Sequence, residues 1–447
     1  MISRRDFLKI SAVTGSGLML PMALNSQYAH AARPFVPPVS PVLTKYMDLL
    51  PIPGQVAPTL NAATGFYELA LSMANSSYSF HSQVGAAQTF GYGGAPYLGP
   101  TIIARRGQPI KLTAANNLGP HPLAAVVTPD PMNVMGIQPE DVATPRAAVH
   151  LHGGYNRVDS DGGPMDFFPR NPTFPAMAGN TYTYTYANDQ QAATLWYHDH
   201  AVGLTRANVY AGLAGYYLLR DEFDTGDPGN PIGLPAGYGT YEIPLVIQDK
   251  SFNADGTLFY APSPAWIPEF FGDVAVVNGK AWPRLDVQQA VYRFRILNGS
   301  QARFYDLRLS SGQVIYQIGT DSGLLDAPVA LPSLVIAPGE RADILVDFTG
   351  SAIGDTIVLQ NNAPAPYPNG KRTNRAGGVP LPEIMQFTVS AAAAAGAVTT
   401  LPASLRGGVG QPPLITRLSA PAHTASIVRQ RYMVLFEVMG PAGPIAI

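Results

Sequence analysis

The chain has 447 residues and a formal net charge of −2, with only 13% charged residues. A nearly neutral chain of this kind offers no basic surface for nucleic acid or for an anionic membrane. It contains no cysteine, which excludes disulfide cross-links within these residues. Its 44 glycines and 43 prolines fall between apolar runs without a repeat period, which indicates a β-rich globular protein with many turns. The length suggests two or three domains.

The N-terminal residues have the pattern of an export signal. Residues 3–9 (SRRDFLK) form a twin-arginine motif, an apolar stretch follows over residues 10–24, and residues 29–31 match an A-x-A cleavage site. The apolar stretch is interrupted by glycine and proline and is too short to span a bilayer. We therefore predict that residues 1–31 are a twin-arginine signal peptide, removed on export by the twin-arginine machinery. The mature protein is expected to be periplasmic or secreted, without a stable membrane anchor.

Residues 32–225 indicate a first β-rich domain. After a proline-rich arm, short apolar runs separated by turns predict strands over residues 66–73, 100–107, 110–114, 148–152 and 210–220. Many short strands with turns between them are typical of a β-sandwich.

Half of the eight histidines lie in two His-x-His triplets, at residues 150–152 and 198–200. In a strand, residues i and i+2 point to the same face, so each triplet presents two imidazoles about 6.6 Å apart at roughly 3.3 Å rise per residue. Imidazole is the commonest metal-ligand side chain and suits copper, zinc, iron and nickel. We therefore predict a metal site, and the residues alone leave zinc open beside copper. Its predicted ligands are His150, His152, His198 and His200.

The other histidines are not expected to bind the metal. His81 and His121 lie among loop residues, where a surface or hydrogen-bonded role is expected. His30 falls in the predicted signal and His423 in a predicted linker.

Residues 240–390 indicate a second β-rich domain, after a Gly-, Pro- and Asp-rich connector at residues 221–239. In one predicted strand, residues 291–298, aromatic and aliphatic side chains alternate with Arg293 and Arg295, which predicts a half-buried strand. The domain contains no histidine, so its predicted role is that of a structural spacer.

Residues 391–447 start with an alanine-rich, low-complexity stretch that predicts a linker. Residues 431–438 then predict a further strand, which cannot bury its faces alone. The predicted fold class is therefore all-β, with tandem Greek-key β-sandwiches: two complete domains plus the first strand of a third.

Several segments resemble one protein family. HLHGG at residues 150–154, DSDGGP at 159–164 and WYHDHAVGLTRANVYAGLAGYYLLRD at 196–221 resemble the first cupredoxin-like domain of multicopper oxidases, in the laccase-like branch with spore-coat laccases, bilirubin oxidases and phenoxazinone synthases. VNGK, YRFRILNGS and APGERADILVDF, at residues 277–280, 292–300 and 337–348, resemble the middle domain of that family. The resemblance spans nearly all of the mature chain.

The resemblance implies a trinuclear copper cluster at which O2 is reduced to water. His150 matches a ligand of the type 2 copper, His152 and His198 match ligands of one type 3 copper, and His200 matches a ligand of the other. Asp161 matches an acidic residue that assists protonation of the reduced oxygen, although Asp-Gly-Gly is also ordinary turn chemistry and both interpretations stay open. The residue between the last two ligands, Asp199, is expected to face away from the metal.

The sequence departs from the family at its C-terminal end. Relatives continue into a third cupredoxin domain, which supplies the other four cluster ligands and a type 1 copper with a cysteine thiolate. Because these 447 residues contain no cysteine, we expect a chain truncated before that domain, with half of the trinuclear ligands and no type 1 site. Such a chain is not expected to turn over alone.

Three functions are compatible with these residues. The first is an oxidase that couples one-electron oxidation of a phenol, aromatic amine, tetrapyrrole or metal ion, as a small reducing substrate, to the reduction of O2. The second is a non-redox periplasmic copper- or zinc-binding protein that uses only the four histidines. The third is a structural or assembly protein, which the retained histidines disfavour.

Overall fold

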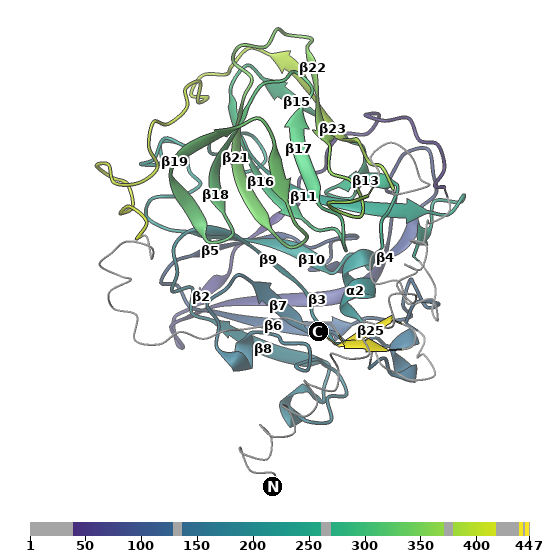
Figure 1. Ribbon diagram of the computed structural model, residues 1–447. Coiled ribbons are helices and arrows are strands. Elements are labelled where there is room, and N and C mark those ends of the chain that lie inside the picture. The colour runs from purple at the N-terminus through teal and green to yellow at the C-terminus, as the bar shows by residue number, and fades with distance from the viewer. Residues whose placement is uncertain are drawn as a thin grey trace, which may run out of the picture. The chain divides into compact units, whose positions relative to one another are not determined.

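The computed structural model describes residues 39–127, 136–260, 270–370 and 379–416, and the backbone of two short strands, β24 (Val438–Gly440) and β25 (Gly443–Ala446) (Figure 1). The described residues belong to one compact unit that begins at residue 37. The predicted signal, His30, His423 and most of the strand predicted at 431–438 lie outside them. In the described part of the chain, no helix is long and apolar enough to cross a membrane.

The first group of strands forms a β-sandwich of two sheets. One sheet has the order β1 (Gln55–Val56), β5 (Thr101–Arg105), β10 (Ala214–Arg220), β9 (Ala193–Asp199) and β7 (Val149–His152). The other has the order β2 (Thr59–Asn61), β3 (Phe66–Tyr78), β6 (Ile110–Asn117) and β8 (Thr181–Tyr186), with β4 (Ala87–Tyr92) paired to β3.

An apolar core lies between these two sheets because alternate residues of each strand point inward. Leu112 and Tyr184 enter the core from one sheet, and Leu151, Leu195 and Tyr217 enter it from the other. Among the described residues, three 3-10 turns and a short helix connect the strands: η1 (Pro139–Val142), η2 (Val158–Ser160), η3 (Pro175–Met177) and α2 (Thr205–Ala211).

The second group of strands forms another pair of sheets. One has the order β14 (Lys280–Ala281), β13 (Val274–Val277), β11 (Glu242–Phe252), β16 (Val291–Asn298), β21 (Arg341–Asp347), β18 (Ile315–Thr320) and β19 (Gly323–Leu331), with β12 (Leu258–Phe259) paired to β11. The other has the order β15 (Arg284–Gln288), β23 (Glu383–Ala391), β22 (Thr356–Asn361), β17 (Tyr305–Leu309) and β20 (Leu334–Ile336). The predicted all-β class is confirmed, whereas the exact domain boundaries stay a prediction.

The prediction of a half-buried strand over residues 291–298 is wrong. All eight residues of β16 are buried, including Arg293 and Arg295, each 1% exposed. Arg293 bonds to Asp224 at 2.8 Å and to Asp343 at 2.9 Å, and Arg295 bonds to Glu242 at 2.7 Å. The arginines are therefore buried because carboxylates from distant parts of the chain neutralise them.

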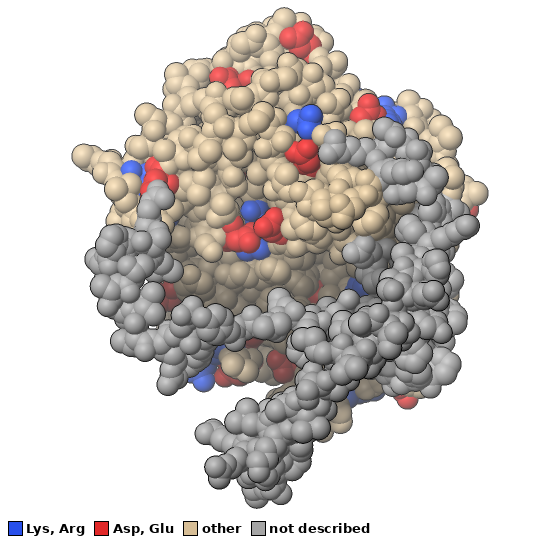
Figure 2. Space-filling model, viewed as in Figure 1, with Lys and Arg blue, Asp and Glu red and all other residues tan. Residues whose placement is uncertain are grey.

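These side chains form a cluster with three positive and three negative groups, here called the ion cluster. Its members are Arg220, Asp224, Glu242, Arg293, Arg295 and Asp343. Burial raises the pKa of Glu242, but the guanidinium groups of Arg220 and Arg295 outweigh it and bring that pKa to about 2. Arg295 also donates to the hydroxyl of Thr194 on β9 at 2.8 Å, so the ion cluster links the two groups of strands. On the face seen in Figure 2, by contrast, charged side chains are few and lie in small groups.

Candidate metal centre

The two His-x-His triplets lie side by side because β7 and β9 pair in antiparallel register. His150 is opposite His198, and His152 is opposite Trp196. Since Val149 and Leu151 point into the apolar core, the two histidines of β7 point to the other face of the sheet. His200 follows the end of β9, and its N–H donates to the carbonyl of Ala148, beside the start of β7.

The structure brings all four predicted ligands together. The ring centroid of His150 lies 5.5 Å from that of His152, 5.3 Å from that of His198 and 5.0 Å from that of His200. The ligand-capable nitrogens of His150, His152 and His198 all lie within 4.8 Å of one another, a grouping suited to a metal ion. Nδ1 of His152 lies 3.3 Å from Nε2 of His198.

Hydrogen bonds from the backbone select which imidazole nitrogens are available to a metal. Nδ1 of His150 donates to the carbonyl of Asp161 at 2.6 Å, and Nδ1 of His198 donates to the carbonyl of Asp199 at 2.7 Å. In a neutral imidazole, the other nitrogen then carries a lone pair, so Nε2 of each ring is the acceptor. Nδ1 of His200 is buried and has no hydrogen-bond partner among the described residues. An uncompensated nitrogen of this kind fits a metal ligand.

The electrostatics of the site favour neutral imidazoles. Burial lowers the pKa of His152 to about 4, and Arg341 and the neighbouring histidines act in the same direction. Burial also holds the pKa of His198 well below its usual range and lowers that of His200. Neutral imidazoles keep the lone pairs that a metal needs at pH 7.

The loop of residues 159–164 is held against β7 by a glycine. Gly162 has φ +69°, and a Cβ atom there would lie 2.1 Å from the carbonyl oxygen of Val149. Only glycine fits this approach. It allows the carbonyl of Asp161 to reach His150.

The two acidic residues of the motifs take different positions. The Asp161 carboxylate lies 3.7 Å from Nδ1 of His150 and is partly exposed, so it touches both the site and solvent. Asp199 shares the face of β9 that carries the core residues Leu195 and Tyr197, and its carboxylate accepts from the N–H of Ala148 at 3.0 Å. Asp199 therefore faces away from the imidazoles, as expected. A role of Asp161 in protonation stays a prediction.

Two further residues at the site, Trp196 and Arg341, were not predicted from the sequence. Trp196 stacks on His198, with ring centroids 4.1 Å apart, and on His152, at 5.1 Å. The two-residue period of β9 would have placed it beside His198. Arg341, on β21, donates to the carbonyl of Thr194 on β9 at 3.1 Å. No local signal marks Arg341, because its contact joins strands about 150 residues apart.

His81 and His121 lie in hydrogen-bonded sites, and both are buried, so the surface alternative is wrong. Nε2 of His81 lies 3.0 Å from the carbonyl of Thr44, and Nε2 of His121 lies 3.0 Å from Oδ1 of Asn208. Neither ring contacts the four histidines of the candidate metal centre.

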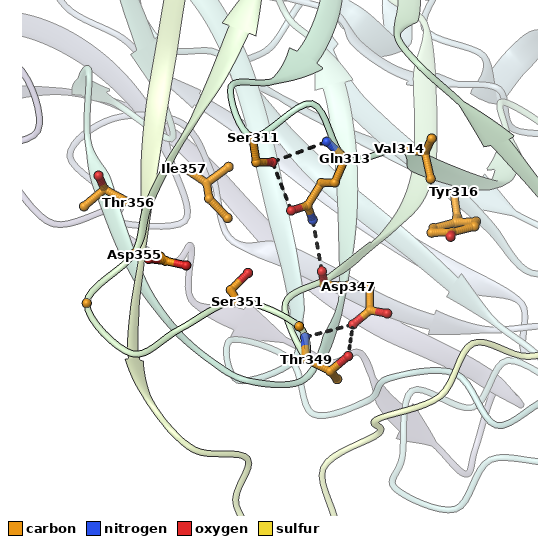
Figure 3. A pocket seen from close by; sticks show the side chains of 12 residues that line it. Ser311, Gln313, Val314, Tyr316, Asp347, Thr349, Ser351, Asp355, Thr356 and Ile357 are labelled. Carbon is orange, nitrogen blue, oxygen red and sulfur yellow. Dashed lines mark hydrogen bonds between the residues drawn. The ribbon is translucent and has the colours of Figure 1, made fainter.

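A polar cavity of about 830 Å³ lies on the second pair of sheets, between residues 311–316 and residues 347–357 (Figure 3). Its side chains bond mainly to one another: Asp347 accepts from the N–H and the hydroxyl of Thr349, and Ser311 donates to Gln313. No histidine lines it, so it is separate from the candidate metal centre.

Comparison with known proteins identifies relatives of the chain. The family model described as multicopper oxidase matches residues 140–223, which include the four histidines and Asp161. A laccase of Bacillus stratosphericus is 40% identical over 334 residues, covering 72% of this chain and 62% of the laccase. The multicopper oxidase LPR2 of Arabidopsis thaliana is 36% identical over 412 residues, covering 88% of this chain and 66% of that protein.

The fold has the same relatives. The crystal structure of the 2F4 variant of McoA, a multicopper oxidase from Aquifex aeolicus, aligns with a TM-score of 0.62 and 30% identity, over 80% of this chain and 68% of that one. The predicted cupredoxin-like fold is confirmed by this similarity. The chain spans between 61% and 66% of the length of four curated relatives that it matches. The protein belongs to the multicopper oxidase family.

Proposed function

We propose that this chain carries half of the dioxygen-reducing copper site of a laccase-like oxidase. The oxidase couples one-electron oxidation of a phenolic, aromatic amine, tetrapyrrole or metal-ion substrate to the four-electron reduction of O2 to water. The observation that supports the proposal is the convergence of four imidazoles from β7, β9 and the residue that follows β9, with neighbouring ring centroids 5.0–5.5 Å apart.

The donor set suits copper. Nε2 of His150 and of His198 are left as acceptors by the hydrogen bonds of their Nδ1 atoms, and Nδ1 of His152 faces His198. In the proposed arrangement, His150 would hold the type 2 copper, His152 and His198 would hold one type 3 copper, and His200 would hold the other. Copper, when bound there, supplies the one-electron redox chemistry and the site at which O2 is reduced.

The residues around the histidines orient them and supply protons. The carbonyls of Asp161 and Asp199 fix the tautomers of His150 and His198, and Trp196 restrains two ring planes by stacking. The Asp161 carboxylate would hold a proton for the reduced oxygen, since it lies beside His150 and reaches solvent.

The remaining parts of the copper machinery are proposed to come from residues outside this sequence. The resemblance to the family implies eight cluster histidines and a cysteine at the type 1 copper. This sequence supplies four matching histidines and no cysteine. We therefore expect these 447 residues to bind copper without turning over a reducing substrate by themselves. The SRRDFLK motif supports export by the twin-arginine route to the periplasm or beyond.

The second candidate function is a non-redox periplasmic protein that binds copper or zinc. It is favoured by the donor set of the described site, which is made of imidazoles alone and suits either metal. Under this alternative, the four histidines are the whole ligand set.

Two measurements test these proposals. The first is the copper content of the purified protein after incubation with Cu(II) and dialysis, measured by mass spectrometry. We expect bound copper in the wild type and its loss when His150 and His198 are both changed to alanine; unchanged copper content would contradict the proposed centre. The second is the coding DNA beyond codon 447, in every frame. An encoded H-C-H-x-x-x-H segment supports the oxidase, and its absence favours the metal-binding protein.

A further inference from the structure

A second cavity lies on the first sandwich, beside the loop that holds His150. Its volume is about 590 Å³, within the range of sites for small molecules. Residues of η2, η3 and β8 line it. None of the four histidines of the candidate metal centre is among its lining residues.

The walls of this cavity are apolar. Phe174, Met177 and Val158 line it together with the ring of Tyr182. Val158 is 87% exposed and Phe174 is 42% exposed. Large apolar side chains held in solvent around a concave site favour a ligand with an apolar body.

The charged groups of the cavity are unbalanced. Asp159 and Asp166 line it, with Arg157 as the single cationic lining residue. Arg157 pairs with Asp159 at 3.4 Å, and both side chains are more than half exposed, which leaves the pairing weak. Asp166 uses Oδ2 to accept from the N–H of Gly163 at 3.0 Å, and one net negative charge remains.

The negative charge of the cavity also acts on the Tyr182 hydroxyl. This hydroxyl donates to the carbonyl of Asp159 at 2.8 Å. Burial raises the pKa of Tyr182, and the carboxylates of Asp159 and Asp166 raise it further. A neutral phenol ring beside two carboxylates offers a cation both charge pairing and a π face.

We propose that this cavity binds a small aromatic molecule that carries one protonated amine. The aromatic ring of the ligand packs among Val158, Phe174 and Met177, and its ammonium group pairs with Asp166 beside the Tyr182 ring. One positive charge neutralises the net charge of the lining. The site uses no imidazole, so the ligand binds with or without metal, and the proposal stands or falls separately from the oxidase.

The test uses two probes with the same phenol ring and the same two-carbon spacer. Tyramine ends in an ammonium group, and 3-(4-hydroxyphenyl)propionate ends in a carboxylate. Binding to the whole chain is followed by the NMR signal of 13C-methyl-labelled Met177, assigned with Met177→Leu. We expect a saturable shift with tyramine that is the same with chelator and with copper, and no shift with the propionate. No saturable shift with tyramine, or equal shifts with both probes, would overturn the proposal.

Matched variants locate the ammonium group. Asp166→Asn keeps a carbonyl oxygen for the Gly163 N–H and removes the charge, so we expect tyramine to bind about tenfold more weakly. Asp227→Asn makes the same change at an exposed position on the connector and should leave tyramine binding unchanged. Phe174→Ala should weaken binding without altering charge. If Asp166→Asn fails to fold, Asp166→Ser takes its place; wild-type affinity in a folded Asp166 variant would refute the ion pair.

Discussion

Nδ1 of His152 and Nε2 of His198 lie 3.3 Å apart, although 46 residues separate the two histidines in the sequence. The register of β7 and β9 creates this contact. It sets His150 opposite His198 and His152 opposite Trp196, so His152 lies diagonally across from His198. Because Nδ1 of His198 donates to a carbonyl, its Nε2 is an acceptor, and Nδ1 of His152 either donates a hydrogen bond to it or faces it with a second lone pair. In the second case, a metal bound by the two nitrogens would remove the opposition of their lone pairs.

His152→Ala removes one nitrogen of this pair and should lower the copper content of the protein. The variant should also abolish pairing of the type 3 coppers in any active oxidase that contains this chain. Copper per chain is measured by mass spectrometry, and pairing by the electron paramagnetic resonance signal of uncoupled Cu(II). His81→Gln is the control, because His81 is buried and hydrogen-bonded away from the centre. Undiminished O2 reduction by His152→Ala would contradict the ligand assignment.

Asp161→Asn separates the two contacts that Asp161 makes with His150. The backbone carbonyl holds Nδ1 at 2.6 Å and is kept in the variant, so copper content should not change. The carboxylate, 3.7 Å from Nδ1, is lost as a proton donor, and O2 uptake by the active oxidase should slow by roughly a hundredfold. Oxygen-electrode rates and copper content are compared in the same samples. Loss of copper would instead make the Asp161 side chain structural.

The part of the site that could be predicted is the part that follows strand periodicity. His150, His152, His198 and His200 were assigned because a two-residue spacing places each pair on one face of a strand. The same period could have included Trp196. The burial of Arg293 and Arg295 was not predictable, because their partners Asp224, Glu242 and Asp343 lie about 50 to 70 residues away in the sequence. Alternation shows which residues share a face, but not whether another part of the chain covers that face.

Trp196 restrains two imidazoles, and its removal should weaken copper binding. Trp196→Ala removes the ring that stacks on His198 and His152, and loss of a contact that orients metal ligands typically costs 10–100-fold in metal affinity. Trp196→Phe keeps an aromatic face and should retain most of the affinity. Copper affinity is measured by competition with a chelator, beside thermal unfolding of both variants. Equal affinity in Trp196→Ala and the wild type would show that stacking does not position these rings.

Arg341 joins the two groups of strands next to the site. Its Nε donates to the carbonyl of Thr194, four residues before His198, and its Nη1 donates to the carbonyl of Gly339. Arg341→Lys keeps the charge but loses the fork of donors, so we expect a changed Cu(II) paramagnetic resonance spectrum and a several-fold weaker copper affinity. Arg284→Lys, on β15 and partly exposed, is the control. An unchanged spectrum in Arg341→Lys would show that Arg341 joins the two groups of strands without influencing the copper site.

The ion cluster should make the stability of the fold depend on pH in acid. The pKa of Glu242 is about 2 in the folded chain and 4.5 as its ordinary value, so ionised Glu242 stabilises the fold fully above pH 4.5. As the pH falls from 4.5 towards 2, the proton binds the unfolded chain first, and about 3 kcal/mol of stability is lost. Urea unfolding between pH 2.5 and 6 measures this loss.

The variant Glu242→Gln tests the assignment to Glu242. It leaves the buried arginines short of a counter-charge, so it should lower the free energy of unfolding by about 3 kcal/mol or more at pH 6. Its stability should then change less between pH 6 and 2.5 than that of the wild type, because the group that titrates is gone. An equally steep acid loss in Glu242→Gln would place the pH dependence in other carboxylates.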